Sequence, residues 1–127
     1  KAEILELYNA GWEVGSHGLS HVDLTIRTDR QESEIMSSKQ RLEKYLGIPI
    51  SSFSYPYGAN DESSIDYVSR AAYLAAVGLG SDMQQGPGNI FYLQRQDVRG
   101  SYDLKTFTQF LPWRGDINNL PMITVVP

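Results

Sequence analysis

Residues 15–21 read Gly-Ser-His-Gly-Leu-Ser-His and carry His17 and His21, the two histidines of the 127-residue chain. A short apolar lead, Trp12-Glu13-Val14, precedes them and predicts a β-strand. Gly18 disfavours a continuous helix through the pair, so we expect a strand end and a tight turn that folds His21 back toward His17. Two neutral imidazoles that converge in this way form half of a metal site. The alternative is a pair of solvated loop histidines, one of them bonded to a backbone carbonyl.

The composition is that of an ordinary globular protein, with 41% hydrophobic and 20% charged residues. We expect residues 1–127 to form a single domain with an irregular tail from about residue 112. A net charge of −4 without a basic run argues against nucleic acid and anionic membrane as partners. The lack of cysteine excludes disulfides, thiolate metal ligands and a cysteine nucleophile. No stretch approaches transmembrane length, so we expect no membrane insertion.

Predicted helices and strands alternate along the chain. Apolar residues at helical spacing, with capping residues, predict helices over 1–10, 28–46, from about 61 to 72, and 101–111. Short apolar or aromatic runs predict strands over 12–14, 51–55, 73–77, 91–98 and 122–126, with a glycine-rich loop over 78–89. This alternation indicates βα units and an α/β fold, either a parallel sheet or part of a barrel.

The helices carry residue-level predictions. Thr28 and Gln31 have the spacing of a capping box, and Asn60 or Asp61 caps the next helix. For the helix over 28–46, the expected buried stripe is Ile35, Leu42, Tyr45 and Leu46, and the expected solvated face is Glu32, Glu34, Lys39, Arg41 and Glu43. The apolar face of the helix after residue 60 is Ile65, Val68 and Ala72. In the last helix, Ser101 is the expected cap, and the residues expected to point inward are Leu104, Phe107, Phe110 and Leu111.

The histidine pair and Pro56-Tyr57-Gly58 each follow a predicted strand. The carboxyl ends of parallel strands lie at the same edge of a sheet, where barrels and open α/β proteins build their sites. We therefore expect the two elements to meet at one rim.

Two stretches resemble motifs of the polysaccharide deacetylases, the NodB-homology group also called carbohydrate esterase family 4. Gly11 to Thr25 resembles the second motif, His-(Ser/Thr)-x-x-His after a Gly-x-Glu-(Ile/Val)-Gly-(Ser/Asn) lead. Ser52 to Gly58 resembles the third motif, Phe-Arg-x-Pro-Tyr-Gly, and the spacing between the two also agrees. Weaker similarities follow at Tyr73 to Val77 (Gly-Tyr-x-x-Ala) and at Leu93-Gln94-Arg95 with the helix around Phe107 (Leu-Pro-Arg … Phe).

The resemblance implies a distorted (β/α) barrel, here a partial one that lacks its first strands. It implies a secreted or cell-envelope enzyme that uses a divalent metal to remove N- or O-acetyl groups from cell-wall or exopolysaccharide sugars. His17 and His21 would be metal ligands, and their chemistry suits zinc, with cobalt or nickel as alternatives. The third ligand and the general base would be the two aspartates of a Thr-Phe-Asp-Asp motif, which we expect upstream of Lys1. Because of this, we expect the chain alone to have little deacetylase activity, and its unpaired sheet edges to favour self-association.

The chain departs from the family pattern at three points. Gly18 stands where the motif has Ser or Thr, and Ser54 stands where it has the arginine that orients the base. Arg95 is our candidate for that arginine's role, with a surface ion pair as the alternative. No histidine follows His21, so the family's closing Leu-x-His motif, which supplies a general acid, has no counterpart.

Further roles follow for neighbouring residues. Deacetylation needs a donor for the oxyanion, and the backbone N–H of Tyr57 is our candidate. Tyr55, Pro56 and Tyr57 are candidate substrate contacts, since aromatic rings stack on sugar faces; the two tyrosines are alternatively core or rim residues. Trp113 is a weaker candidate, with hydrophobic cover as its alternative. We expect Asp23 and Asp97 to serve turns and caps rather than a metal.

Three functions remain open from the sequence. The first is a metal-dependent polysaccharide deacetylase acting on an acetylated polysaccharide. The second is a non-catalytic carbohydrate-binding domain on a degenerate deacetylase fold. The third is a structural metal-binding domain.

Overall fold

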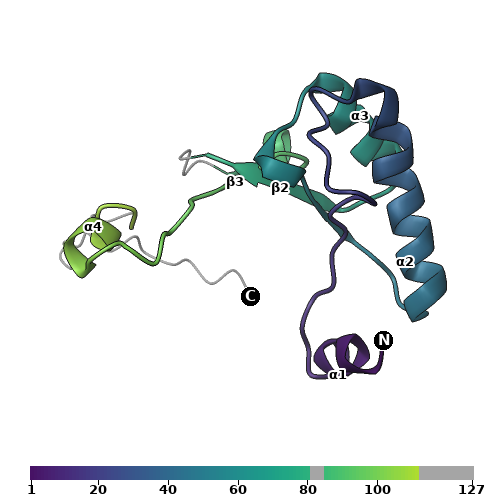
Figure 1. Cartoon of the computed structure of the whole chain (residues 1–127), viewed down its shortest axis with the longest axis horizontal. Coiled ribbons are helices and arrows are strands. Elements are labelled where there is room, and N and C mark those ends of the chain that lie inside the picture. The colour runs from purple at the N-terminus through teal and green to yellow at the C-terminus, as the bar shows by residue number, and fades with distance from the viewer. Residues whose placement is uncertain (81–84, 112–127) are drawn as a thin grey trace. The chain divides into compact units, whose positions relative to one another are not determined.

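The computed structural model of the chain describes residues 1–80 and 85–111, and the chain divides into two compact units, Lys1–Arg95 and Gln96–Pro127 (Figure 1). In the first unit the helices are α1 (Ala2–Asn9), α2 (Ser38–Leu46) and α3 (Glu62–Arg70), and the strands are β1 (Ser52–Ser54), β2 (Ala75–Leu79) and β3 (Leu93–Arg95). Short helical turns are η1 (Thr28–Arg30), η2 (Ser33–Ser37, a π-helix), η3 (Pro56–Gly58) and η4 (Pro87–Asn89). The predicted single domain over 1–127 stays a prediction, and Trp113 and the strand expected over 122–126 lie outside the described residues.

The three strands form a parallel sheet in the order β1-β2-β3. The expected α/β class with parallel strands is thus confirmed. Within the described residues, no helix is both long and apolar enough to span a membrane.

The prediction of a strand over 12–14 is wrong. These residues form no strand, and the segment that contains them pairs with the sheet at Ser16, which bridges to Phe53. In this register, Pro49 and Ile50 lie opposite the start of the expected strand. Proline has no N–H to donate. Ile50 donates its N–H to Glu43 at 3.1 Å, and its carbonyl accepts from Lys39.

The strand expected over 73–77 is displaced by two residues, since β2 begins at Ala75 rather than at Tyr73. Tyr73 is buried against Phe53, and its hydroxyl donates to the carbonyl of Ile35 at 3.0 Å. Gly78 and Leu79, expected in a loop, continue the strand because they pair with β3.

The two faces of the sheet differ. Phe53 and Ala76 point into a core formed with residues of the helices and loops: Leu24, Ile35, Leu46, Ile50, Tyr55, Val68 and Tyr73. The opposite face bears half-buried, mostly small side chains, and a hollow of about 560 Å³ lies on it, lined by residues of all three strands and by His17. A sheet with its helices on one face and a hollow on the other matches a segment of a barrel wall.

The helical segment before the sheet differs from its prediction in several ways. Thr28 and Gln31 form no capping box; Thr28 opens η1 without a side-chain cap, and Gln31 is buried and donates to Leu24 and Asp61. Tyr45 is 57% exposed, whereas Glu34, expected on the solvated face, is fully buried. The buried face follows residues 31, 34, 35 and 38, and a wide π-helical turn over residues 33–37 precedes α2. This segment packs beside α3 (Figure 1).

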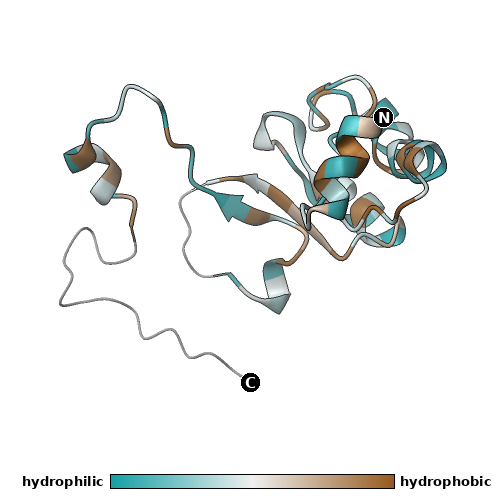
Figure 2. Ribbon diagram, turned by 90° about the horizontal axis from the view of Figure 1, so that it is seen from below, coloured by the Kyte–Doolittle hydropathy of each residue, from teal (hydrophilic) through white to brown (hydrophobic). Residues whose placement is uncertain are grey.

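Helix α1 and the helix described in the second unit contain no buried residue. The ribbon of α1 carries hydrophobic as well as hydrophilic segments (Figure 2). In the second unit, α4 spans Leu104–Thr108 and its N-cap is Asp103, which accepts from the Thr106 N–H at 2.7 Å, rather than Ser101. Leu104 and Phe107 are exposed, so the expectation that they point inward is wrong, while Phe110 stacks on Tyr102.

The cap of α3 is confirmed. Asp61 accepts from the Ser64 N–H at 2.8 Å, and the Ser64 hydroxyl accepts from the Asp61 N–H at 2.9 Å, which completes a capping box. Val68 is buried and Ile65 half-buried as expected, whereas Ala72 is exposed with a φ of 56° in the turn that leads to β2.

Removing this cap tests the fold. We expect Asp61→Ala to lower the free energy of unfolding by about 1–2 kcal/mol, because it removes the helix cap and one partner of the buried Gln31 amide. Urea unfolding followed by circular dichroism measures the change. Asp66→Ala is the control. This exposed aspartate lies on the same helix and makes a weak surface ion pair with Arg70, at 3.4 Å, so its loss should lower the free energy of unfolding by less than about 0.5 kcal/mol. Equal losses in the two variants would contradict the role of the cap.

Candidate active site

The candidate residues gather at the carboxyl end of the sheet. His17 follows Ser16, which bridges to β1; Tyr57 lies in the turn after β1; and Arg95 is the last residue of β3. The structure therefore brings together the two elements that the sequence placed at one rim.

His17 and His21 face each other across the turn. Their ring centroids are 4.9 Å apart at an interplanar angle of 66°, and both side chains are exposed. Left-handed backbone at Gly18 (φ 85°) and at His21 (φ 54°) folds the loop back on itself. The φ of Gly18 favours glycine, and a Cβ at this position would lie 2.9 Å from a carboxylate oxygen of Glu34.

The His17 ring is oriented by the backbone of β1. Its Nδ1 lies 2.6 Å from the carbonyl oxygen of Ser54, so Nδ1 carries the proton and donates. This bond leaves Nε2 with a free lone pair, which is the arrangement found for histidine ligands of metals. The donor chemistry and the proximity of the two rings fit a divalent metal such as zinc. Among residues 1–80 and 85–111, no third histidine, cysteine, aspartate or glutamate joins the pair.

Tyr57 borders the histidines. Its ring centroid lies 4.7 Å from that of His21, and the residue is 63% exposed. Its backbone has a φ of 58°, an uncommon value for a residue with a side chain. The following Gly58 permits a close approach to β2, since a Cβ there would come within 2.6 Å of Leu79.

Tyr55 and Pro56 lie in the core rather than at the surface. Tyr55 packs edge-on against Phe53, and its hydroxyl donates to the carbonyl of Phe91 at 2.8 Å. Burial, with the charge of Asp61 as a smaller cause, raises the pKa of this hydroxyl well above its ordinary value. With both residues buried, neither offers a ring face to a sugar in this structure.

Arg95 reaches back to β1. Its Nη2 donates to the Ser54 hydroxyl at 2.9 Å, and its Nε donates to the carbonyl of Gly78 at 3.2 Å. Arg95 thus contacts the residue whose carbonyl holds His17, and it lies at the position where the motif comparison expects an arginine.

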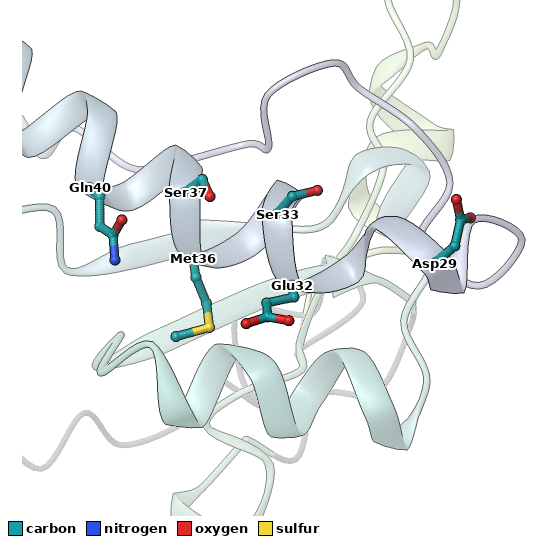
Figure 3. A pocket seen from close by; sticks show the side chains of 6 residues that line it. All are labelled: Asp29, Glu32, Ser33, Met36, Ser37 and Gln40. Atoms are coloured by element: carbon teal, nitrogen blue, oxygen red, sulfur yellow. The ribbon is translucent and has the colours of Figure 1, made fainter.

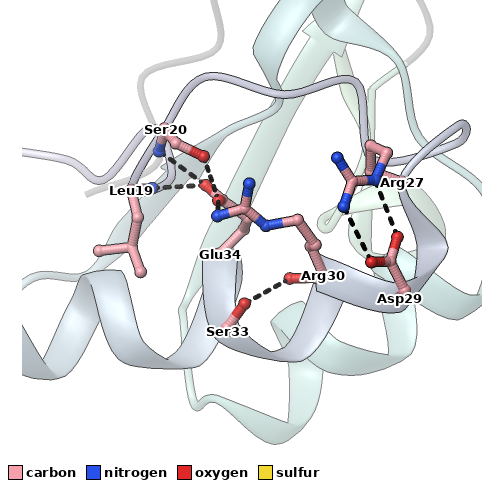
Figure 4. Close-up of polar contacts among 7 residues, drawn as sticks. All are labelled: Leu19, Ser20, Arg27, Asp29, Arg30, Ser33 and Glu34. Atoms are coloured by element: carbon pink, nitrogen blue, oxygen red, sulfur yellow. Dashed lines mark hydrogen bonds and ion pairs between the residues drawn. The ribbon is translucent and has the colours of Figure 1, made fainter.

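Glu34 is part of the site architecture that the sequence reasoning missed. Its carboxylate accepts from the backbone N–H groups of Leu19 and Ser20 and from the Ser20 hydroxyl, and it pairs with Arg30 (Figure 4). The signal was available: Gln31, Glu34 and Ser38 share the helical spacing of the buried Ile35, so position 34 falls on the inward stripe.

A hollow of about 440 Å³ adjoins the histidines. It is lined by His21, Val22, Asp23, Ile26, Arg27 and Tyr57. Ile26 is 75% exposed, and Arg27 is held by a two-point pair with Asp29 (Figure 4). An apolar surface next to a polar, hydrogen-bonding rim is suited to a sugar ring.

Another hollow, of about 360 Å³, lies along the helical segment away from these residues. Its lining residues are Asp29, Glu32, Ser33, Met36, Ser37 and Gln40, and Glu32 and Met36 point toward α3 (Figure 3). It contains neither of the histidines, so we do not assign the site to it.

Asp23 has the expected role in a turn, whereas Asp97 pairs with an arginine. Asp23 accepts from the N–H and the hydroxyl of Thr25, which lowers the pKa of its carboxyl and closes a turn after His21. Asp97 is exposed and lies 3.4 Å from Arg99.

Comparisons with known proteins identify similar sequences and folds among the polysaccharide deacetylases. Residues 1–76 match the sequence profile of the polysaccharide deacetylases, whereas no curated protein matches in sequence. A polysaccharide deacetylase from Bacillus cereus superposes with a TM-score of 0.72 at 25% identity, over 86% of this chain and 35% of that one. A deacetylase from Streptococcus pyogenes in complex with acetate gives 0.65 at 22% identity, over 76% and 43%. A de-N-acetylase from Aggregatibacter actinomycetemcomitans gives 0.69 at 18% identity, over 87% and 52%.

The chain thus spans about a third to a half of the length of these structures. Its three parallel strands and their helices correspond to part of such a barrel, as the sequence predicted.

The buried carboxylate predicts how stability depends on pH. Burial alone would raise the pKa of Glu34, but the hydrogen bonds from Ser20 and Leu19 and the charge of Arg30 outweigh it and lower the pKa below its ordinary value of 4.5. Because the pKa is lower in the folded state, Glu34 stabilises the fold above about pH 4.5, and this contribution is lost as the pH falls through the folded-state value. Between about pH 5 and 3, the free energy of unfolding should fall more steeply for the parent than for Glu34→Gln. Parallel slopes in urea unfolding would contradict this.

Proposed function

The chain belongs to the polysaccharide deacetylase family, and from this premise we propose that it forms part of a metal-dependent hydrolase that removes N- or O-acetyl groups from cell-wall or exopolysaccharide sugars. The observation that carries the proposal is the facing pair of His17 and His21, with His17 oriented through Nδ1 by the Ser54 carbonyl. We further propose a secreted or cell-envelope location, which is where such polymers are found.

In this proposal His17 and His21 hold the ion, zinc or alternatively cobalt or nickel. A zinc ion bound by imidazole and carboxylate ligands lowers the pKa of its water to about 7 and polarises a carbonyl. The two rings supply two ligands, and the carboxylate that completes such a site corresponds to the first aspartate motif of the family.

The neighbouring residues handle the substrate. The backbone N–H of Tyr57 lies in the strained turn beside His21 and donates to the oxyanion that forms when the acetyl carbonyl is attacked. The Tyr57 ring and Ile26 border the hollow next to His21, where a sugar of the polymer packs. Arg95, held on Ser54, orients the carboxylate that acts as general base.

A second candidate function is carbohydrate binding without catalysis. The exposed Tyr57 ring and the hollow beside it would hold a sugar whether or not a metal is present. Sugar binding that is unchanged in His17→Ala, together with no acetate release by the full gene product, would favour this candidate.

Zinc binding tests the histidine pair. We expect both His17→Ala and His21→Ala to abolish zinc binding by the full gene product, whereas Asp23→Ala should leave it intact, because Asp23 bonds to Thr25 in the turn. Zinc affinity should also weaken in acid, where imidazoles take up protons. Isothermal titration with zinc at about pH 7.5 measures the affinity. Parent-like affinity in His21→Ala would show that the two histidines do not form a chelate.

Acetate release tests the reaction itself. The full gene product, loaded with zinc, should release acetate from an acetylated chitooligosaccharide, and His17→Ala should reduce the rate at least about 1,000-fold, because groups that act together in catalysis are lost together. Arg99→Ala is a matched control, since this exposed arginine pairs, among the described residues, with the exposed Asp97 at 3.4 Å and should keep the parent rate. Release at the parent rate by His17→Ala would exclude the proposed metal role.

A further inference from the structure

The turn between the histidines needs its backbone N–H groups held. For His21 to fold back on His17, the N–H groups of Leu19 and Ser20 point to the same side of the loop. Both donate to one oxygen of Glu34, at 2.7 and 2.9 Å, and the Ser20 hydroxyl donates to its other oxygen (Figure 4). A single side chain from the helical segment therefore binds the centre of the histidine turn at three points.

Glu34 is buried, so its charge must be compensated by these hydrogen bonds and by an ion pair. Its side chain is 0% exposed, and a buried carboxylate is costly unless it is paired and hydrogen-bonded. Arg30, one helical turn earlier, approaches its other oxygen at 3.0 Å and compensates the charge. An apolar residue would fill this position at lower cost but would leave the Leu19 and Ser20 N–H groups without an acceptor.

Two local features adapt the chain to this contact. Glu34 lies in the π-helical turn Ser33–Ser37, a wide turn of a kind often found at functional sites. Gly18 leaves the space that the carboxylate needs, because a Cβ at that position would lie 2.9 Å from the same Glu34 oxygen. The glycine that departs from the family motif therefore lies next to the Glu34 carboxylate.

We propose that Glu34 is a positioning residue of the histidine site: by holding the Leu19 and Ser20 N–H groups, it sets His21 against His17 in the geometry that binds a metal ion. The part that concerns the metal rests on the proposed function. The part that concerns the loop rests on the hydrogen bonds alone.

Substitutions of Glu34 separate the effect of its side-chain length from the effect of its charge. Glu34→Gln keeps an oxygen within reach of both N–H groups and removes the charge, whereas Glu34→Asp keeps the charge and is one methylene too short. Glu34→Ala removes both. Glu43→Ala is the matched control: Glu43 lies on the same helical segment, also accepts a backbone N–H, that of Ile50, and also pairs with a cation, Lys39.

Two measurements are made on each variant. The first is the NMR of the metal-free chain, with the nuclear Overhauser contact between the His17 and His21 rings and the hydrogen exchange of the Leu19 and Ser20 N–H groups. The second is the zinc affinity of the full gene product by isothermal titration, with urea unfolding as the measure of stability. We expect Glu34→Asp and Glu34→Ala to lose the ring contact, to exchange faster and to bind zinc about 10- to 100-fold more weakly. Glu34→Gln should stay within about fivefold of the parent, and Glu43→Ala should lose stability without a change at the histidines.

The outcomes distinguish the two proposals. If the parent binds no zinc, the proposed metal role fails, while the ring contact and the exchange rates still decide the role of Glu34. If Glu34→Ala does not fold, the comparison of Glu34→Asp with Glu34→Gln decides it. The inference is overturned if Glu34→Asp keeps the ring contact and the zinc affinity, or if Glu43→Ala weakens zinc binding as much as Glu34→Asp does.

Discussion

The parallel pairing of Ser16 with the centre of β1 is the contact on which the site depends. The Ser16 N–H donates to the carbonyl of Ser52 at 2.9 Å, and its own carbonyl accepts from the Ser54 N–H at 2.8 Å. His17 is the next residue, so this register brings its ring to the Ser54 carbonyl and to the carboxyl end of the sheet. Because side chains alternate along a strand, a slip of one residue would turn His17 to the other face.

Ser16 also forms a hydrogen bond with the start of α2. The Ser16 hydroxyl bonds to the buried Ser38 hydroxyl at 2.8 Å, which in turn donates to the carbonyl of Ile35. Glu34 and Gln31, on the same buried stripe, bond to the histidine turn and to Leu24 and Asp61. Within the described residues, every buried side-chain nitrogen or oxygen has a hydrogen-bond partner. A buried polar network of this kind contains less apolar surface than an apolar core. Because its hydrogen bonds are all formed, it specifies one position for the loop that carries the histidines.

Much of the site could be read from local patterns. The alternation of helices and strands predicted the parallel sheet, and the rule that strand ends share an edge predicted that the histidines and Tyr57 would meet. Asp61 and Asp23 were predicted correctly because caps and turns depend on residues a few positions away. The sequence placed Glu34 and Tyr45 on the wrong face of their helix, and it left Tyr55 open between the site and the core. A helical or strand pattern indicates a face without showing what packs on it.

By itself, the sequence determined the residue types, the order of the elements and the motif that predicted the family, since these depend on spacing along the chain. Only the tertiary structure decided which side chains are buried beneath the histidine turn and which stay exposed beside it. The packing of the helical segment against the histidine turn buries Glu34 and leaves Tyr45 exposed, and the strand register directs Arg95 onto Ser54. These outcomes depend on contacts between residues 14 to 41 positions apart, which no local pattern encodes.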